Sequence, residues 1–204
     1  MIKRVLSYSA AVVLGVAAGV VSALVMSGLW SGKQPMEFSD VNVDGWVSDF
    51  AVGSDQASPY VRARVARHGL LALAKSEAVY FMRNADNEGR PLSEDCDYQI
   101  SGRKLPAGWW SITLYQTSDS KLPDNDDAAL SIDATSVIAE SGSWSTLVAP
   151  QRPDGTANWI SSRNSEDFDL LLRLYVPDQA LLDSPESALS PPTIERLSCK
   201  GEAA

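Results

Sequence analysis

A long uncharged apolar run at the N-terminus constrains this chain more than any other feature. Residues 5–32 contain no charged side chain, and Val, Ala, Leu and Met dominate the run. A helix needs roughly 20 apolar residues to cross a hydrocarbon core of about 30 Å, and Tyr8 to Trp30 is long enough. Lys3 and Arg4 precede the run, and such positive charges stay on the cytoplasmic side. We therefore expect one transmembrane helix, with a cytoplasmic N-terminus and the rest of the chain outside the cytoplasm.

The alternative for this run is a cleaved signal peptide. Signal peptides have a shorter apolar core of about 7–15 residues, followed by a site with small residues. Residues 21–23 (Val-Ser-Ala) loosely fit such a site, but the apolar run continues to Met26, so cleavage would leave an apolar new N-terminus. We expect an uncleaved anchor over residues 1–33 and an exported domain over residues 34–204. Either interpretation exports the domain.

Small residues recur along the apolar run at helical spacing. Gly15 and Gly19 form a G-x-x-x-G pair, and Ala11 and Ala23 continue the spacing. Small side chains let two membrane helices approach closely, so this face is a candidate for packing between helices. Glycine and alanine are also common in membrane helices without such a partner. The sequence therefore predicts contact with the lipid bilayer and leaves the packing partner open.

The rest of the chain is strongly acidic. The net charge is −9, and because Lys3, Arg4 and Lys33 belong to the membrane segment, the remainder carries −12. Binding to nucleic acid requires basic side chains that neutralise phosphates, and the remainder has no basic tract. We therefore exclude a nucleic-acid partner. The remainder, about 170 residues, is long enough for one domain with a hydrophobic core.

Two cysteines, Cys96 and Cys199, lie in the exported part. Thiol pairs tend to oxidise outside the cytoplasm, so we expect a disulfide between them, with two free thiols as the alternative. A loop of about 100 residues would be closed, for which chain entropy gives a stabilisation of about 4–5 kcal/mol. The single histidine and two cysteines provide no ligand set for zinc, so we expect no metal and no cofactor.

Most of the exported part has the pattern of short strands. Ser58 and Pro59 predict a helix start, as N-cap and first helical residue, and the helix is expected to continue to about Ala74. Trp46 and Phe50 precede it as candidate contacts with the core. The strand candidates are residues 78–82, 97–100, 109–115, 130–132, 145–148, 158–160, 169–176 and 193–199. We expect the first two of these to pair as a hairpin.

The stretch from Trp109 to Tyr115 has a clear alternation. Trp110 shares one face with Ile112 and Leu114, whereas Trp109 and Tyr115 share the other. One tryptophan is therefore expected in the core and its neighbour outside the core or under a loop. One helix followed by many short strands favours an antiparallel β-sandwich over an α/β fold.

Several motifs occur in a characteristic order. They are Gly53-Ser54-Asp55 with Tyr60-Val61-Arg62-Ala63, Glu77-Ala78-Val79-Tyr80 with Asp86 to Pro91, Leu105-Pro106 before Trp110 to Tyr115, Asn158-Trp159-Ile160 with Leu172 to Tyr175, and Pro191 to Glu195. This ordered set resembles the family DUF1214, a domain of unknown function in bacterial envelope proteins. It is similar to small membrane-anchored members from alphaproteobacteria.

The resemblance has limited but definite implications. It implies a β-rich, jelly-roll-like fold and a periplasmic location beyond an inner membrane. It makes a DUF1254-type protein a candidate partner, because the two domains often occur together. It implies no established activity.

Catalytic motifs are absent from the sequence. His68 is the only histidine, so a Ser-His-Asp or Cys-His site would have to use it. It lies among arginines on the predicted helix, and no G-x-S-x-G motif is present, so we expect a surface histidine and no catalytic residue of this kind. Paired carboxylates about 5–10 Å apart, as in glycoside hydrolases, remain an open alternative. The sequence gives no reason to select any pair.

A polar loop gathers oxygen donors of the kind that calcium prefers. Asp124, Asp126 and Asp127 lie close together there, but Ala129 occupies the position of the glycine that an EF-hand requires. We therefore expect a solvated loop and no metal, with an irregular calcium site as the alternative.

Two groups of residues are candidates for ligand binding. Arg64 and Arg67 are basic residues in an acidic chain, suited to a phosphate or sulfate group unless they pair with local acids. Trp109, Tyr115 and Trp159 are aromatic residues on predicted strands, suited to stacking on sugar rings or partner side chains unless they pack under loops.

We therefore expect a mainly β chain: an antiparallel, jelly-roll-like β-sandwich with one N-terminal helix, preceded by a single transmembrane helix. The expected role is a non-catalytic, periplasm-facing envelope domain that binds a protein partner or a glycan. The alternative is a carboxylate-dependent hydrolase of envelope carbohydrate. A cleft with two close carboxyl groups would favour the hydrolase, and a shallow face with Trp109 or Trp159 would favour the binding domain.

Overall fold

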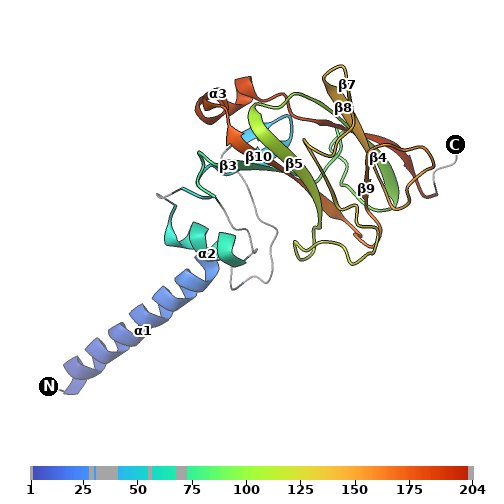
Figure 1. Ribbon diagram of the computed structural model, residues 1–204. Helices are drawn as coiled ribbons and strands as arrows, with labels where there is room; N and C mark the ends of the chain where they lie inside the picture. The colour runs from blue at the N-terminus through green and yellow to red at the C-terminus, as the bar shows by residue number, and fades with distance from the viewer. Residues whose placement is uncertain (1, 28–29, 31–40, 55–56, 68–72, 202–204) are drawn as a thin grey trace.

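The computed structural model describes residues 2–27, 30, 41–54, 57–67 and 73–201 (Figure 1). Helix α1 (Ile2–Met26) extends away from the rest of the molecule. Its segment Tyr8–Met26 has a mean hydropathy of 2.3, and none of it is buried inside the molecule. Gly15 and Gly19 lie on α1 with open space around them. The helix has the length and composition of a membrane anchor or a signal sequence.

One sheet, called here the larger sheet, is antiparallel throughout. Within the described residues it has six strands in the order β1-β2-β3-β10-β5-β6. The strands are β1 (Val41–Val43), β2 (Trp46–Ser48), β3 (Ala78–Arg83), β5 (Ala107–Gln116), β6 (Ser131–Asp133) and β10 (Phe168–Pro177).

The other sheet, called here the smaller sheet, has five strands in the described part of the chain. Its order is β11-β4-β8-β7, and β9 pairs with β8 as the one parallel neighbour there. The strands are β4 (Cys96–Arg103), β7 (Ala139–Glu140), β8 (Ser143–Ala149), β9 (Trp159–Ser161) and β11 (Thr193–Cys199).

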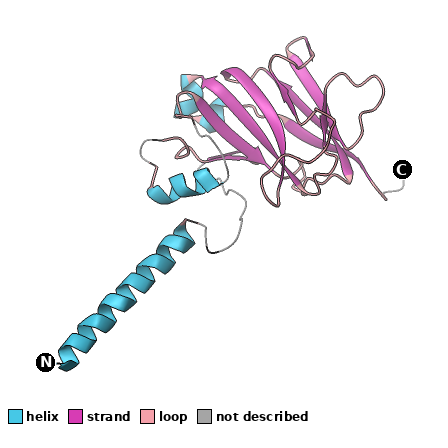
Figure 2. Ribbon diagram, turned by 60° about the horizontal axis from the view of Figure 1, so that its bottom comes forward, coloured by secondary structure: helices cyan, strands magenta, loops and turns pink. Residues whose placement is uncertain are grey.

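The two sheets pack face to face as a β-sandwich, which confirms the predicted fold class (Figure 2). Trp110 of β5 stacks on Trp144 of β8, with ring centroids 4.5 Å apart. Tyr98 of β4 meets Phe168 of β10 edge to face at 5.8 Å. Aromatic side chains from both inner faces therefore interlock in one core.

The alternation predicted for residues 109–115 is confirmed. Trp110 is 7% exposed and its neighbour Trp109 is 37% exposed. Ile112 and Leu114 are buried on the same face as Trp110. The period of two therefore selects which tryptophan enters the core.

The predicted disulfide is also present. Cys96 begins β4, Cys199 ends β11, and the two residues are direct neighbours in the strand register. The bond joins segments separated by 103 residues and fixes the last strand at the edge of the smaller sheet. A disulfide is typical of proteins that fold outside the cytoplasm.

Helix α2 (Pro59–Arg67) begins where the sequence predicted. The backbone N–H of Val61 donates to the Ser58 hydroxyl at 3.3 Å, so Ser58 caps the helix. The predicted end near Ala74 is wrong: residues 68–72 lie outside the described residues, and Leu73 and Ala74 are not helical. The N–H of Leu73 donates to the Tyr80 hydroxyl at 3.1 Å, so contact with β3 replaces helical hydrogen bonding there.

The predicted hairpin between residues 78–82 and 97–100 is wrong. Strand β3 pairs with β2 and β10, whereas β4 pairs with β8 and β11 in the other sheet. The connecting turn is organised by Asp86, which is 1% exposed, accepts N–H bonds from Glu88 and Arg90, and pairs with Arg196 of β11 at 3.0 Å. Burial opposes ionisation of Asp86, but the hydrogen bonds from Arg90 and Glu88 outweigh it and lower its pKa. The turn therefore connects β3 of the larger sheet to β4 of the smaller sheet.

The remaining strand predictions are confirmed within a few residues, and the short elements were missed. Strands β1, β2 and β7 and helix α4 (Pro185–Ala188) are too brief to show a sequence period, and helix α3 (Gln179–Asp183) precedes α4. Trp46 is fully buried as expected, with its indole N–H donating to the Pro192 carbonyl at 2.8 Å. Phe50 packs against the same core.

Candidate functional site

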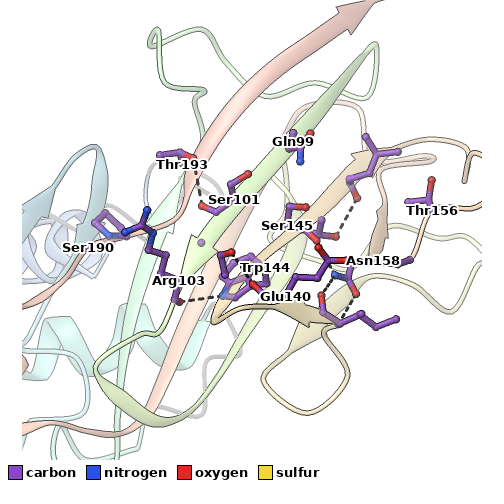
Figure 3. Close-up of a pocket in the computed structure, with 17 residues that line it drawn as sticks. Gln99, Ser101, Arg103, Glu140, Trp144, Ser145, Thr156, Asn158, Ser190 and Thr193 are labelled. Carbon is purple, nitrogen blue, oxygen red and sulfur yellow. Dashed lines mark hydrogen bonds between the residues drawn. The ribbon is translucent and has the colours of Figure 1, made fainter.

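A polar trough of about 940 Å³ lies on the outer face of the smaller sheet (Figure 3). Its floor comes from β4 and β8, whose inward residues enter the core and whose alternate residues point outward. Gln99 and Ser101 of β4 form one half of the floor, and Ser145 and Leu147 of β8 form the other. The strand register places Ser101 opposite Ser145 and Gln99 opposite Leu147, so the floor is continuous across the two strands.

Two walls rise beside this floor. One is the segment of Ser190 and Pro191 that leads into β11, continued by Thr193, whose hydroxyl donates to the Ser101 carbonyl at 3.4 Å. The other comprises Ile138, Glu140 and the loop of residues 156–158. The walls therefore come from segments far apart in sequence, brought together by the order of strands in the sheet.

Asn158 holds the second wall in place. Its amide nitrogen donates to the carbonyls of Ile138 and Ser145, each at 2.8 Å, and its amide oxygen accepts the N–H of Ile138 at 2.9 Å. One side chain thus ties the 156–158 loop to both the wall and the floor. Asn158 is a positioning residue of the trough.

Trp144 supports the floor from the core side. A Cβ atom on Gly102 would lie 2.3 Å from the Trp144 ring, so glycine is needed for this close approach. The indole N–H of Trp144 donates to the Arg103 carbonyl at 3.1 Å. The trough therefore rests on a packed layer, which keeps its shape rigid.

Several polar side chains in the trough are free to meet a ligand. Within the described part of the chain, the side chains of Gln99, Ser101, Arg103, Glu140 and Ser145 make no hydrogen bond or ion pair. The serine hydroxyls and the glutamine amide can both donate and accept. Arg103 and Glu140 carry opposite charges, so the trough is close to neutral in an acidic chain.

The trough offers no paired carboxylates. Among the described residues that line it, Glu140 is the only acid. A two-carboxylate hydrolysis mechanism requires a second carboxyl across the cleft. The described residues of the trough therefore do not form the two-carboxylate arrangement.

The candidate aromatic residues are divided between the two sheets. Trp159 of β9 lies beside Leu147 in the register, at the flank of the trough, with its indole N–H donating to the Ala149 carbonyl at 3.0 Å. Trp109 and Tyr115 lie on the outer face of the larger sheet. The structure therefore brings only Trp159 near the trough.

The side chains of the basic candidates lie outside the part of the chain that the structure describes. The side chains of Arg64 and Arg67, and all of His68, lie outside the described residues. Arg62 is described, and its Nε donates to the Ala57 carbonyl at 3.1 Å. The predicted binding role of Arg64 and Arg67 stays a prediction.

Arg163 forms ion pairs with the acidic loop that contains Asp126 and Asp127. Arg163 donates to both Asp126 and Asp127, and Asp127 also accepts the Ser161 hydroxyl at 2.6 Å. Hydrogen bonds from Arg163 lower the pKa of both carboxyls. Nowhere in the described residues do three His, Cys, Asp or Glu side chains gather as a metal site would require. The carboxylates of Asp126 and Asp127 therefore form ion pairs with the guanidinium of Arg163.

The polar residues of the trough were not among the predicted site residues. Their signal is present in the sequence as the alternation of Tyr98-Gln99-Ile100-Ser101, in which every second residue is polar. That pattern indicates a solvated strand face. It does not indicate that β8, with its own outward serines, lies beside that face.

Comparisons with known proteins give a family match and a solved structure of similar fold. A family model described as "Protein of unknown function (DUF1214)" matches residues 77–179. A crystal structure from Vibrio parahaemolyticus is similar, with a TM-score of 0.57 and 22% identity, over 70% of this chain and 36% of that one. A crystal structure of an uncharacterised protein from Burkholderia cenocepacia has a TM-score of 0.39 and 18% identity, over 63% of this chain and 31% of that one. This chain thus matches only about a third of those longer proteins. No curated protein matches it.

Proposed function

This chain belongs to the DUF1214 family, and from that premise we propose that it is a non-catalytic envelope-binding domain whose trough holds an uncharged, hydroxyl-rich ligand, a carbohydrate. One observation carries the proposal. Unpartnered side chains that can both donate and accept hydrogen bonds are set side by side on β4 and β8, at the floor of a trough with a rigid base.

The chemistry of the floor favours sugars over a protein surface. The buried core of a protein interface is depleted of charge and rich in large apolar side chains. Here the floor is dominated by Gln99, Ser101 and Ser145, which match sugar hydroxyls as donors and acceptors. Trp159 at the flank supplies an aromatic ring of the kind that stacks on sugars. The volume lies within the range of about 300–1,000 Å³ that ligand pockets occupy.

Helix α1 is proposed to be an uncleaved anchor that holds this domain on the periplasmic side of the inner membrane. The exposed apolar surface of α1 and the disulfide support this arrangement. The ligand would then be a polymer within reach of the membrane surface. A DUF1254-type protein remains a proposed neighbour of the domain.

Binding can be tested on the full chain in a polyoxyethylene detergent, because alkyl glycoside detergents carry the chemistry under test. We expect calorimetric titration with a neutral oligosaccharide to give measurable binding, weakened at least tenfold by the double substitution S101A and S145A. S131A is the matched control, since Ser131 is an exposed strand residue of the larger sheet. Equal affinity for the double variant and the control would overturn the proposal.

The anchor can be tested in cells without reference to the ligand. A phosphatase fused after the last residue should be active, and the mature protein should keep its N-terminal segment when analysed by mass spectrometry. An N-terminus near Leu24 would replace the anchor with a cleaved signal peptide and leave the trough proposal intact.

A further inference from the structure

Arg173 occupies an unusual position on the outer face of the larger sheet. It is half-buried on β10, in a chain with 26 acidic and 17 basic residues. No carboxylate of the described residues lies within ion-pair distance of its guanidinium. Its partners are instead two hydroxyls: Nη1 donates to Thr113 Oγ1 at 3.0 Å and Nη2 donates to Tyr115 Oη at 2.7 Å.

These contacts leave a group of donors without acceptors. Each hydroxyl oxygen accepts a guanidinium N–H, so its own proton must point elsewhere. Among the described residues no acceptor receives the proton of Thr113 or Tyr115. The guanidinium lies over the Tyr115 ring, 5.5 Å from its centroid, which fixes its orientation. The cluster therefore presents one positive charge and two hydroxyl groups that can donate a hydrogen bond.

The surroundings strengthen this arrangement. Half-burial reduces solvent screening, so a charge on a ligand is felt more strongly than at an exposed arginine. Tyr175 lies two residues along β10 on the same face, and its ring is 5.3 Å from that of Trp109. The Trp109 indole N–H is already bonded to Thr135 at 2.9 Å. The pair therefore offers ring surface on the same sheet face, on the other side of Arg173 from Thr113 and Tyr115 in the strand register.

We infer that Arg173, Thr113 and Tyr115 form a binding site for an oxyanion, a carboxylate or phosphate group, carried by a ligand whose body lies against Trp109 and Tyr175. An oxyanion carries negative charge and accepts hydrogen bonds, so it can take both the remaining guanidinium N–H groups and the two hydroxyl protons. The site is on the other sheet from the trough and does not depend on the proposed function.

The test uses the full chain in a polyoxyethylene detergent at low ionic strength, with inorganic phosphate, glucuronate and glucose as probes. We expect phosphate or glucuronate to shift the NMR signal of the Arg173 Nε–H. Glucuronate, which has a sugar body, should also shift the signal of the Trp109 indole, and glucose should leave both signals unchanged. Binding of phosphate alone or glucuronate alone identifies the source of the oxyanion, and either supports the site. Equal response to glucose would overturn it.

Variants locate the response. Arg173→Gln should weaken binding at least tenfold, and Thr113→Val, which removes one donor and keeps the shape, should weaken it severalfold. Arg152→Gln is the matched control, because Arg152 bonds only backbone carbonyls in an exposed loop of the described chain. The trough variant S101A with S145A should bind the anion normally. Unchanged anion affinity in both Arg173→Gln and Thr113→Val would overturn the site, whatever the trough binds.

Discussion

The outer faces of the two sheets differ in how they are covered. In β10 of the larger sheet, Leu170, Leu172 and Leu174 are buried in the core, and Leu171 is only 5% exposed on the opposite face. Leu171 belongs to a second apolar cluster with Tyr80 and Val52. In β4 of the smaller sheet the outward residues are polar and partly exposed.

The number of faces that a strand buries explains the sequence patterns of both β10 and β4. A strand buried on both faces is apolar at consecutive positions, whereas a strand with one solvated face alternates. The run Leu170 to Leu172 is of the first kind, and Tyr98 to Ser101 is of the second. The second kind leaves a whole sheet face open to a polar ligand.

The largest expected effect concerns the disulfide. We expect replacement of both Cys96 and Cys199 by alanine to cost about 4–5 kcal/mol in the free energy of unfolding, because it releases a loop of about 100 residues in the unfolded chain. Hydrogen exchange should show β4 and β11 losing protection before β3 and β10. Equal loss of protection in both sheets would contradict the difference in their dependence on this bond.

A matched pair of alanine substitutions tests the covered face directly. Leu171→Ala should cost about 2–4 kcal/mol, because it opens a cavity in the second apolar cluster. Gln99→Ala, at an outward position of the other sheet, should change stability by less than about 0.5 kcal/mol. Urea denaturation measures both. Similar costs for the two would show that the outer faces are equivalent.

The covered face also predicts a pH dependence. Asp169, 6% exposed on the larger sheet, accepts the Thr117 hydroxyl at 3.0 Å, and burial raises its pKa from 3.8 to about 6. Below pH 3.8 the Asp169 carboxyl is protonated in both the folded and the unfolded state. Because the unfolded state loses this proton at a lower pH than the folded state, the free energy of unfolding falls as the pH rises from 3.8 through 6. Above pH 6 the total decrease in the free energy of unfolding is roughly 3 kcal/mol.

Asp169→Asn removes this titration. We expect the variant to be more stable than the natural chain at pH 7.5, by up to about 3 kcal/mol, and to have nearly equal stability near pH 4. Urea denaturation at the two pH values gives the difference. A difference that is the same at both pH values would contradict the burial of this carboxyl.

The smallest expected effect concerns the base of the trough. Gly102→Ala would place a methyl group against the Trp144 ring, so we expect a loss of about 1–2 kcal/mol as the ring moves. Ser101→Ala, one residue away with its side chain outward, should change stability by less than about 0.5 kcal/mol. Thermal unfolding distinguishes them, and a neutral Gly102→Ala would show that Trp144 does not support the floor.

The predicted site residues and the two proposed sites overlap in part for a physical reason. Trp109, Tyr115 and Trp159 are predicted because they are aromatic residues on predicted strands, and the alternation of residues 109–115 puts Trp109 and Tyr115 on one face. The alternation could not show that Tyr115 lies beneath Arg173, or that Gln99 lies across from Leu147, because both neighbours come from other strands. Strand pairing brings together residues distant in sequence, and the pairing of β4 was predicted wrongly for the same reason.

The sequence by itself determined the apolar helix, the sandwich class and the opposite directions of Trp109 and Trp110. Each depends on local spacing or on composition, which hydropathy and the period of two express directly. Only the tertiary structure decided that Cys96 meets Cys199, that β4 joins β8, and that the trough and the Arg173 cluster lie on different sheets. These depend on which strands become neighbours, and packing of the whole core selects that arrangement.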